Sequence, residues 1–181
     1  MKILLGVTGG IAAYKSCALV SLAAKRGHEV RVVMTENATR FVGTATFEAL
    51  SGHGVMLDTF GDGDTAGIDH IEWAKWCDVM LIAPLTANTL GKLACGLADD
   101  ALSTVAMALP RGRPALLAPA MNTEMWEHPV VQRNLKWLGE LGRYEVIQPI
   151  SKRLACGVDG MGGMEEPPAI LAALERAVEG Q

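Results

Sequence analysis

Three segments of the sequence combine small, hydroxyl or amide side chains with a position just after a strand-like run. They are the glycine turn Gly6–Gly10, the Thr- and Asn-containing segment 84–89, and segment 119–126. In an open parallel sheet the loops after the strands meet at one edge, where helix N-termini present unpaired amides. The three segments therefore predict a pocket of neutral hydrogen-bond donors. Such a pocket suits a phosphorylated planar ligand better than a metal ion.

The glycine turn allows two interpretations. Gly9 and Gly10 permit a tight strand-to-helix turn, so Thr8 and the nearby amides are expected to meet a phosphate. Packing alone would also require such a turn, and its pattern is not the GxGxxG of dinucleotide-binding proteins. Segment 35–39, after the second expected strand, adds hydroxyls and an Asn, a pattern too common to predict a site by itself.

Hydrophobic periodicity alternates strands and helices along the chain. Strands are expected at 2–7, 29–34, 55–57, 78–83, 114–118 and 144–148. Helices are expected at 11–25, 38–50, 69–76, 85–95, 98–109, 124–138 and 167–178, with an irregular glycine-rich segment at 149–164. The alternation predicts one α/β domain over residues 1–181, a Rossmann-like or flavodoxin-like doubly wound parallel sheet of five or six strands in a three-layer sandwich.

Composition narrows the function classes. The 181 residues suit a single domain, half of them are hydrophobic, and the net charge is 16 − 20 = −4. No segment concentrates Lys and Arg, which argues against nucleic-acid binding. The N-terminal apolar run is too short for a signal sequence or membrane span, so a cytoplasmic protein is expected. The cysteines have no disulfide or zinc spacing, and three are expected to be reduced and buried: Cys17, Cys77 and Cys95.

Two of the three segments carry a family resemblance. PLTANT at 84–89 resembles the PxxANT motif, and PAMNTEMW at 119–126 resembles the PxMNxxMW motif, of the flavin-containing cysteine decarboxylases. His70, in the segment DHIEW, is similar to the catalytic histidine of that family. LACG at 154–157, followed by GMGGM at 160–164, resembles the cysteine-bearing substrate clamp of the members that act in coenzyme A biosynthesis. The resemblance covers nearly the whole chain and places the clamp at about 149–166.

The resemblance implies FMN as cofactor and 4'-phosphopantothenoylcysteine as the small-molecule substrate, which is decarboxylated to 4'-phosphopantetheine. In the implied reaction the substrate thiol is oxidised to a thioaldehyde, CO2 leaves, and the enethiol is reduced again. His70 is the implied thiol base and Cys156 the implied proton donor. The implied substrate-binding residues are Asn122, Met125, Ala155 and Gly157. The implied cofactor-binding residues are Gly9, Gly10, Ile11, Thr35, Thr86, Ala87, Asn88, Thr89 and Ala120, and no metal is implied.

The resemblance also bears on assembly and on substrate contacts. A homotrimer or dodecamer is implied, and it stays open whether His70 serves its own or a neighbouring subunit's FMN. The chain ends soon after the clamp, so no fused ligase domain is expected and a separate phosphopantothenate–cysteine ligase is implied. Thr86 and Gly10 stand where the family often has Ser, and Gly163 stands where bacterial members commonly carry Arg. Without that cation, the residue that contacts the substrate phosphate is not identified.

Several alternatives stay open. A lone His on an amphipathic helix is often structural, and an Asn after a strand can serve only its turn. Among enzymes of the same fold, the alternatives are a peptidyl-cysteine decarboxylase, which lacks the equivalent of Cys156, and a flavin prenyltransferase, which uses a cationic phosphate pocket. A non-catalytic flavin-binding regulatory protein tends to carry long acidic extensions. A flavodoxin-type electron carrier would not need His70, Asn122 and Cys156.

Overall fold

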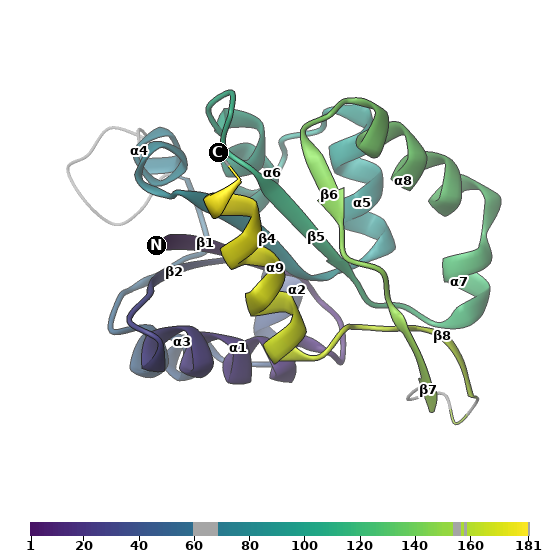
Figure 1. The fold of residues 1–181 in the computed structure, drawn as a ribbon, viewed down its shortest axis with the longest axis horizontal. Coiled ribbons are helices and arrows are strands. Elements are labelled where there is room, and N and C mark those ends of the chain that lie inside the picture. The colour runs from purple at the N-terminus through teal and green to yellow at the C-terminus, as the bar shows by residue number, and fades with distance from the viewer. Residues whose placement is uncertain (60–68, 154–156, 158, 181) are drawn as a thin grey trace.

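Over residues 1–59, 69–153, 157 and 159–180, which the computed structural model describes, the chain forms a six-stranded parallel sheet between layers of helices (Figure 1). Its strands are β1 (Lys2–Val7), β2 (Glu29–Met34), β3 (Val55–Met56), β4 (Val79–Leu85), β5 (Ala115–Pro119) and β6 (Tyr144–Val146). They lie in the order β3-β2-β1-β4-β5-β6. This is the doubly wound order, with its switch point between β1 and β4, and the predicted fold class is confirmed.

Helices cover both faces because the strands are hydrophobic on both sides. On one face, the helices that pack with Ile3, Leu5 and Val7 are α1 (Ala13–Lys25), α3 (Thr44–Ser51) and α9 (Pro167–Glu179). On the other face, the helices that pack with Leu4 are α4 (Asp69–Trp76), α5 (Ala87–Cys95), α6 (Ala101–Ala108) and α8 (Pro129–Glu140). Alternate residues of β1 thus enter two separate hydrophobic clusters, which makes the predicted three-layer sandwich.

Two helices expected as single elements are each divided. The range 38–50 overlaps α2 (Glu36–Thr39) and α3, which begins after its extended N-cap Gly43. The range 124–138 overlaps α7 (Thr123–Glu127) and α8, which are separated at His128. Pro129, at the start of α8, has no N–H to donate and disfavours the helical conformation at the residue before it. His128 accordingly leaves the helix, and its Nδ1 accepts a hydrogen bond from Val130 N at 3.2 Å.

A second, two-stranded antiparallel sheet stands where the sequence predicted an irregular segment. It consists of β7 (Ile150–Arg153) and β8 (Asp159–Gly163). Glycine has low strand propensity, so the sequence of β8 gives little sign of a strand. Tertiary contacts position it instead: Met121 N donates to Gly162 O at 2.9 Å, and Thr123 Oγ1 donates to Met161 O at 2.9 Å. The β7–β8 sheet is thereby attached to the loop after β5.

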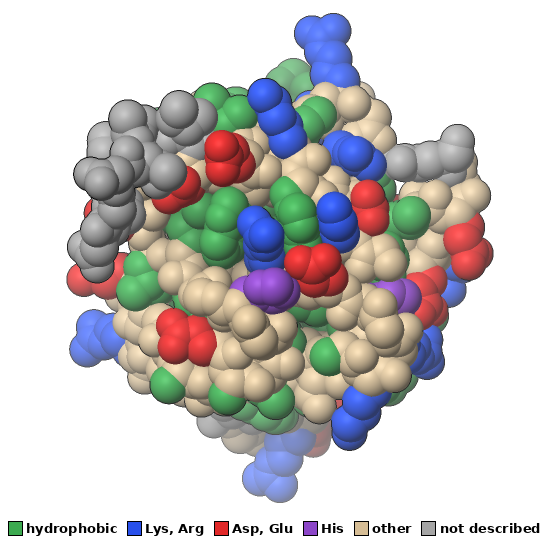
Figure 2. All heavy atoms as spheres, turned by 90° about the vertical axis from the view of Figure 1, so that its left-hand side faces the viewer, with side chains coloured by type: hydrophobic (Ala, Val, Ile, Leu, Met, Phe, Trp, Pro, Cys, Tyr) green, Lys and Arg blue, Asp and Glu red, His purple; other side chains and the backbone are tan. Residues whose placement is uncertain are grey.

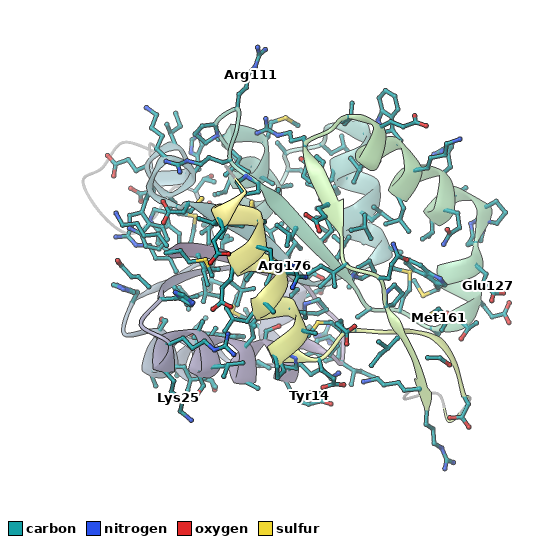
Figure 3. The ribbon with its side chains drawn as sticks, viewed as in Figure 1. Tyr14, Lys25, Arg111, Glu127, Met161 and Arg176 are labelled. Carbon is teal, nitrogen blue, oxygen red and sulfur yellow. The ribbon has the colours of Figure 1, made fainter. Side chains whose placement is uncertain are left out.

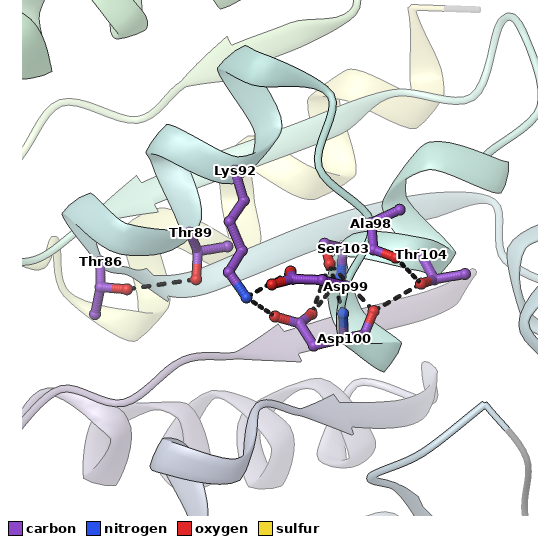
Figure 4. A network of polar contacts seen from close by, with 8 residues as sticks. All are labelled: Thr86, Thr89, Lys92, Ala98, Asp99, Asp100, Ser103 and Thr104. Atoms are coloured by element: carbon purple, nitrogen blue, oxygen red, sulfur yellow. Dashed lines mark hydrogen bonds and ion pairs between the residues drawn. The ribbon is translucent and has the colours of Figure 1, made fainter.

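A polar network fixes the start of α6, which begins later than predicted (Figure 4). Asp100 is the N-cap, and its Oδ1 accepts a hydrogen bond from Ser103 N at 2.8 Å. Ser103 Oγ accepts one from Asp100 N at 3.2 Å, which completes a capping box. Lys92 of α5 donates to Asp100 at 2.6 Å and pairs with Asp99 at 2.7 Å. The network therefore joins α5 to α6.

The three cysteines that the structure describes differ in burial. Cys77 is fully buried, as predicted, and its Sγ donates to Ala74 O at 3.4 Å. Cys17 is half-buried. Cys95 is exposed, so its predicted burial is wrong. It is the last residue of α5, where the helix ends at Gly96 and its side chains reach solvent.

The face at the left of Figure 1 mixes basic, acidic and hydrophobic side chains at its surface, as Figure 2 shows. Arg31 of β2 lies over the ring of Trp76 at 4.4 Å from the centroid and over that of Trp73 at 5.5 Å. These cation–π contacts cover part of both α4 rings. Within the described ranges, no helix is both long and apolar enough to cross a bilayer.

Candidate functional site

A cavity of about 450 Å³ opens at the carboxyl ends of β1, β4 and β5. Its walls are the turn after β1, the starts of α1 and α5, the loop after β5, and the β7–β8 sheet. Doubly wound sheets bind ligands at this switch point. Eight residues of the predicted site line the cavity together: Gly9, Gly10, Ile11, Thr86, Ala87, Ala120, Asn122 and Met125.

The hydroxyl of Thr8 is used inside the protein and not in the cavity. Its Oγ1 donates to the carbonyl oxygen of Pro84 at 2.7 Å and accepts from Thr86 N at 3.1 Å. Thr8 is only 1% exposed, so the expectation that it meets a phosphate is wrong. β4 continues through Pro84 to Leu85, beyond its predicted end. Thr8 ties this extension to the end of β1 and so fixes the spacing of the two loops at the switch point.

The starts of α1 and α5 keep some backbone amides for a ligand, although Ala13 N donates to Gly10 O and Thr86 N to Thr8 Oγ1. The N-cap residues are Ala12 and Thr86, and neither side chain caps its helix. Thr86 Oγ1 instead donates to Thr89 Oγ1 at 3.4 Å (Figure 4). A Cβ on Gly9 would lie 2.6 Å from Cβ of Asn37, so the turn before α1 requires glycine. Two helix N-termini without side-chain caps at one cavity fit an anionic group such as the phosphate of FMN.

Asn122 both caps α7 and faces the cavity. Its Oδ1 accepts a hydrogen bond from Met125 N at 2.8 Å, so the amide is held by its oxygen. This leaves the Nδ2 end, which can only donate, for a ligand. Met125 lies on the same wall and is 44% exposed. The turn-forming role and the ligand-binding role, which the sequence left as alternatives, are therefore compatible.

Three predicted cofactor-binding residues lie outside the cavity lining. Thr35 is the N-cap of α2, Asn88 is exposed, and Thr89 is buried. Successive residues of a helix point in different directions, so only part of the PLTANT segment can face one ligand. Thr86 and Ala87 line the cavity, and the two residues after them do not.

The predicted catalytic histidine does not line the cavity of its own chain. His70 lies in the first turn of α4, which packs on α6 and β1. Its Nδ1 is buried and has no hydrogen-bond partner in the described part of the chain. Gly157, with φ of 85°, is exposed and also lies outside the cavity lining. Ala155 and Cys156 lie outside the described residues, so their roles stay predictions.

The cavity also contains residues that the sequence analysis did not give as individual binding residues. Two of them are lysines, Lys15 of α1 and Lys152 of β7. Lys15 is 5% exposed, and its Nζ donates to Met164 O at 2.9 Å and to Glu166 Oε1 at 2.5 Å. One signal was available, because Lys15 lies one helical turn after Ile11 on the apolar side of the expected helix. The other lining residues are Ala12 and Tyr14, Met121 of the predicted segment 119–126, and Arg153, Gly162, Gly163 and Met164, which like Lys152 lie within the predicted clamp 149–166.

The charged groups of this wall perturb one another. The hydrogen bond from Lys15 holds the pKa of Glu166 below its ordinary value. Burial, followed by the neighbouring Lys15, lowers the pKa of Lys152. This wall carries the ammonium groups of Lys15 and Lys152 and the carboxylate of Glu166, so its net charge is positive. The cavity therefore has a neutral side rich in amides and a cationic side formed by α1 and β7.

Comparisons with known proteins agree over nearly the whole chain. The family model described as Flavoprotein matches residues 1–179. The coenzyme A biosynthesis bifunctional protein CoaBC of Bacillus subtilis is 48% identical over 175 residues, which are 97% of this chain and 42% of that protein. The chain thus spans less than half the length of this relative. The "probable phosphopantothenoylcysteine decarboxylase" of Streptococcus mutans is 43% identical over 174 residues, 96% of this chain and 97% of that protein.

Solved structures share the architecture. A PPC decarboxylase mutant complexed with pantothenoylaminoethenethiol has a TM-score of 0.88 and 37% identity, covering 98% of each chain. The FMN binding protein AtHal3 has a TM-score of 0.85 and 38% identity, covering 99% of this chain and 97% of the other. The family model, the relatives and the solved structures each cover both the sheet and the cavity. The chain belongs to the Flavoprotein family.

Proposed function

We propose that the chain is an FMN-dependent decarboxylase that converts 4'-phosphopantothenoylcysteine to 4'-phosphopantetheine in the cytoplasmic synthesis of coenzyme A. The observation that carries the proposal is the cavity at the switch point, where the glycine turn, the uncapped start of α5 and Asn122 meet. Relatives named for this reaction support the same substrate.

The residues around the cavity fit FMN. The amides at the starts of α1 and α5 would hold a phosphate, and Gly9 and Gly10 allow close approach to the backbone. Ala87 and Ala120 offer small apolar surfaces to a flat ring. When bound, FMN supplies the acceptor for a hydride from the carbon that bears the substrate sulfur, and later the donor that returns it.

The chemical difficulty lies in the electron pair that CO2 leaves behind. The neighbouring amide nitrogen cannot accept that pair, whereas a thioaldehyde β to the carboxylate accepts it as an enethiolate. Asn122 would donate from Nδ2 to the carboxylate, since its Oδ1 is already engaged. This donor is neutral, so it orients the carboxylate without an ion pair that would oppose the loss of its charge.

Two proton transfers complete the proposed reaction. His70 removes the thiol proton of the substrate as a general base, and Cys156 returns a proton as the enethiol is reduced. His70 does not line its own cavity, so we place it at the cavity of a neighbouring subunit in a trimer-based assembly. Ile11 and Tyr14, which line the cavity and are each 61% exposed, offer an apolar surface for that neighbour. Tyr14 is labelled in Figure 3.

The proposed function is tested with FMN-loaded protein and 4'-phosphopantothenoylcysteine, by following CO2 and product mass. We expect a bound-flavin spectrum, one CO2 per substrate, and the mass of 4'-phosphopantetheine. The Asn122→Asp variant keeps an oxygen that caps α7 but places an anion beside the substrate carboxylate. It should bind FMN and lose about 100-fold or more in kcat. Flavin-loaded protein that releases CO2 only from peptides ending in cysteine, or from neither substrate, would contradict the proposal.

A further inference from the structure

Two lysine side chains meet on the cationic side of the cavity. Lys15 is buried and engaged by Met164 O and Glu166 Oε1. Lys152 also lines the cavity and lies close enough to Lys15 for their charges to interact. Among the described residues, no hydrogen bond or ion pair reaches the ammonium of Lys152. The carboxylate of Glu166 attracts both ammonium groups, but it can balance only one of the two positive charges, so a further anion would stabilise the pair.

Gly163 makes room for the Lys152 side chain. A Cβ at position 163 would lie 2.6 Å from Cε, 2.9 Å from Cγ and 3.0 Å from Cδ of Lys152. Any larger residue at 163 would therefore displace the lysine. The backbone of Gly163 has no positive φ that would itself require glycine. The glycine thus matters for the space it leaves, and that space holds a cation at the cavity wall.

The β7–β8 sheet also links this cation to Asn122. Gly162, the residue before Gly163, accepts a hydrogen bond from Met121 N at 2.9 Å. A Cβ on Gly162 would lie 2.2 Å from Met121 O, so β8 runs directly against the loop that carries Asn122. The cationic wall and Asn122 therefore face the same cavity. The uncapped helix starts that fit the cofactor phosphate belong to α1 and α5.

We propose that Lys152, with Lys15 beside it, binds the phosphate monoester of the substrate and makes the site selective for phosphorylated substrates. This inference rests on the proposed function and names the phosphate contact within it. A phosphate monoester carries a charge of about −1.5 to −2 near neutral pH. It would neutralise the excess positive charge of the two ammonium groups and Glu166, and it would supply the acceptor that Lys152 lacks.

The experiment compares 4'-phosphopantothenoylcysteine with its phosphate-free analogue pantothenoylcysteine on FMN-loaded protein. Wild-type protein should favour the phosphorylated substrate in kcat/KM. Lys152→Met keeps the stem of the side chain and removes its charge. It should lower kcat/KM for the phosphorylated substrate by about 10- to 100-fold, the size expected for a lost hydrogen bond to a charged group, and leave the analogue unchanged. The control Lys25→Met changes an exposed lysine elsewhere on α1 (Figure 3). It should leave kcat/KM for both substrates unchanged.

A second variant moves the cation within the same space. Lys152→Ala vacates the room beside position 163, and adding Gly163→Arg places a guanidinium there. The double variant should regain most of the phosphate preference that Lys152→Ala loses. If the double variant preferred the phosphorylated substrate no more than Lys152→Ala does, the two side chains would not share one position.

Four results would overturn the phosphate assignment. CO2 release from both substrates with equal kcat/KM in wild-type protein refutes the assignment and leaves the proposed function standing. Equal losses on both substrates in Lys152→Met would show a structural role. Weaker binding of FMN but not of riboflavin by Lys152→Met, with substrate preference intact, would assign the phosphate to the cofactor. CO2 release from neither substrate would refute the proposed function and this inference together.

Discussion

At the scale of single residues, what a polar side chain already contacts decides whether it is available to a ligand. Thr8 and Asn122 both follow strands that end at the cavity. The hydroxyl of Thr8 accepts from Thr86 N and donates its only hydrogen to Pro84 O, so it has no hydrogen left for a phosphate. Asn122 uses only Oδ1 for its cap and keeps two Nδ2 hydrogens. A sequence shows both residues but not this difference.

Replacement of Cys156 separates the two halves of the proposed reaction. Ser in place of Cys156 is a much weaker acid, so we expect CO2 release to continue and reduction of the enethiol to fail. The product mass should then be that of the enethiol, two hydrogens below 4'-phosphopantetheine. Mass spectrometry of a single-turnover reaction checks this outcome. Normal yields of 4'-phosphopantetheine from Cys156→Ser would contradict the proton-donor role.

The described cysteines should differ in reactivity. Burial raises the pKa of Cys77 to about 11, against a smaller lowering by the Arg113 charge. Burial also raises the pKa of Cys17, whereas Cys95 is exposed. Because the thiolate is the reactive form, Cys95 should be alkylated first and Cys77 last at pH 8. Peptide mapping after timed iodoacetamide treatment measures the order. Early labelling of Cys77 in folded protein would show that its side chain opens to solvent.

At the scale of elements, the start of α6 depends on Asp100. Asp100→Ala removes the cap acceptor for Ser103 N and the partner of Lys92, and should cost about 1 kcal/mol of unfolding free energy. For a domain of this size the melting temperature should fall by about 2 to 4 °C. Asp99→Ala is the matched control, because Asp99 is exposed and caps nothing. It should change stability by less than about 0.5 kcal/mol in a urea titration.

The pH dependence of this contribution follows from the pKa of Asp100. Burial alone would raise that pKa, but hydrogen bonds from Lys92 and Ser103 outweigh it and hold it below 3.8. The stabilisation is therefore present above the unfolded-state value and is lost as pH falls through the lower folded-state pKa. The stability difference between wild type and Asp100→Asn should be constant from pH 5 to 7 and shrink below about pH 3.8. A difference that grows on acidification would contradict the assignment.

Sequence periodicity predicted the sheet better than it predicted the ends of helices. The strands of the main sheet carry continuous apolar runs, and burial on two faces leaves such runs few alternatives. The division at His128 was predictable from Pro129. The β7–β8 sheet was not, because contacts from Met121 and Thr123 position its glycines. The amide-rich side of the cavity came from motifs near strand ends, whereas Lys152 reaches it only through tertiary structure.

At the scale of the whole molecule, His70 and the cavity of the same chain lie apart. His70→Asn and Asn122→Asp should each inactivate the protein in the proposed reaction. Suppose that the two variants are co-expressed in equal amounts and that each cavity takes His70 from one chain and Asn122 from another. Each of the two residues is then intact in about half of the cavities, so both are intact in about one quarter of them. We therefore expect about one quarter of wild-type CO2 release from a hybrid of two inactive variants. Activity no higher than that of either variant would place both residues in one chain's site.

The contact of Lys15 with Met164 and Glu166 joins the first helix to a segment near the end of the sequence. During synthesis on the ribosome, the first five strands and the glycine turn emerge well before this segment does. A nascent chain can thus assemble most of its sheet while one wall of the binding cavity is still missing. Flavin capture should consequently wait until residues 164–166 have emerged and this wall of the cavity has formed.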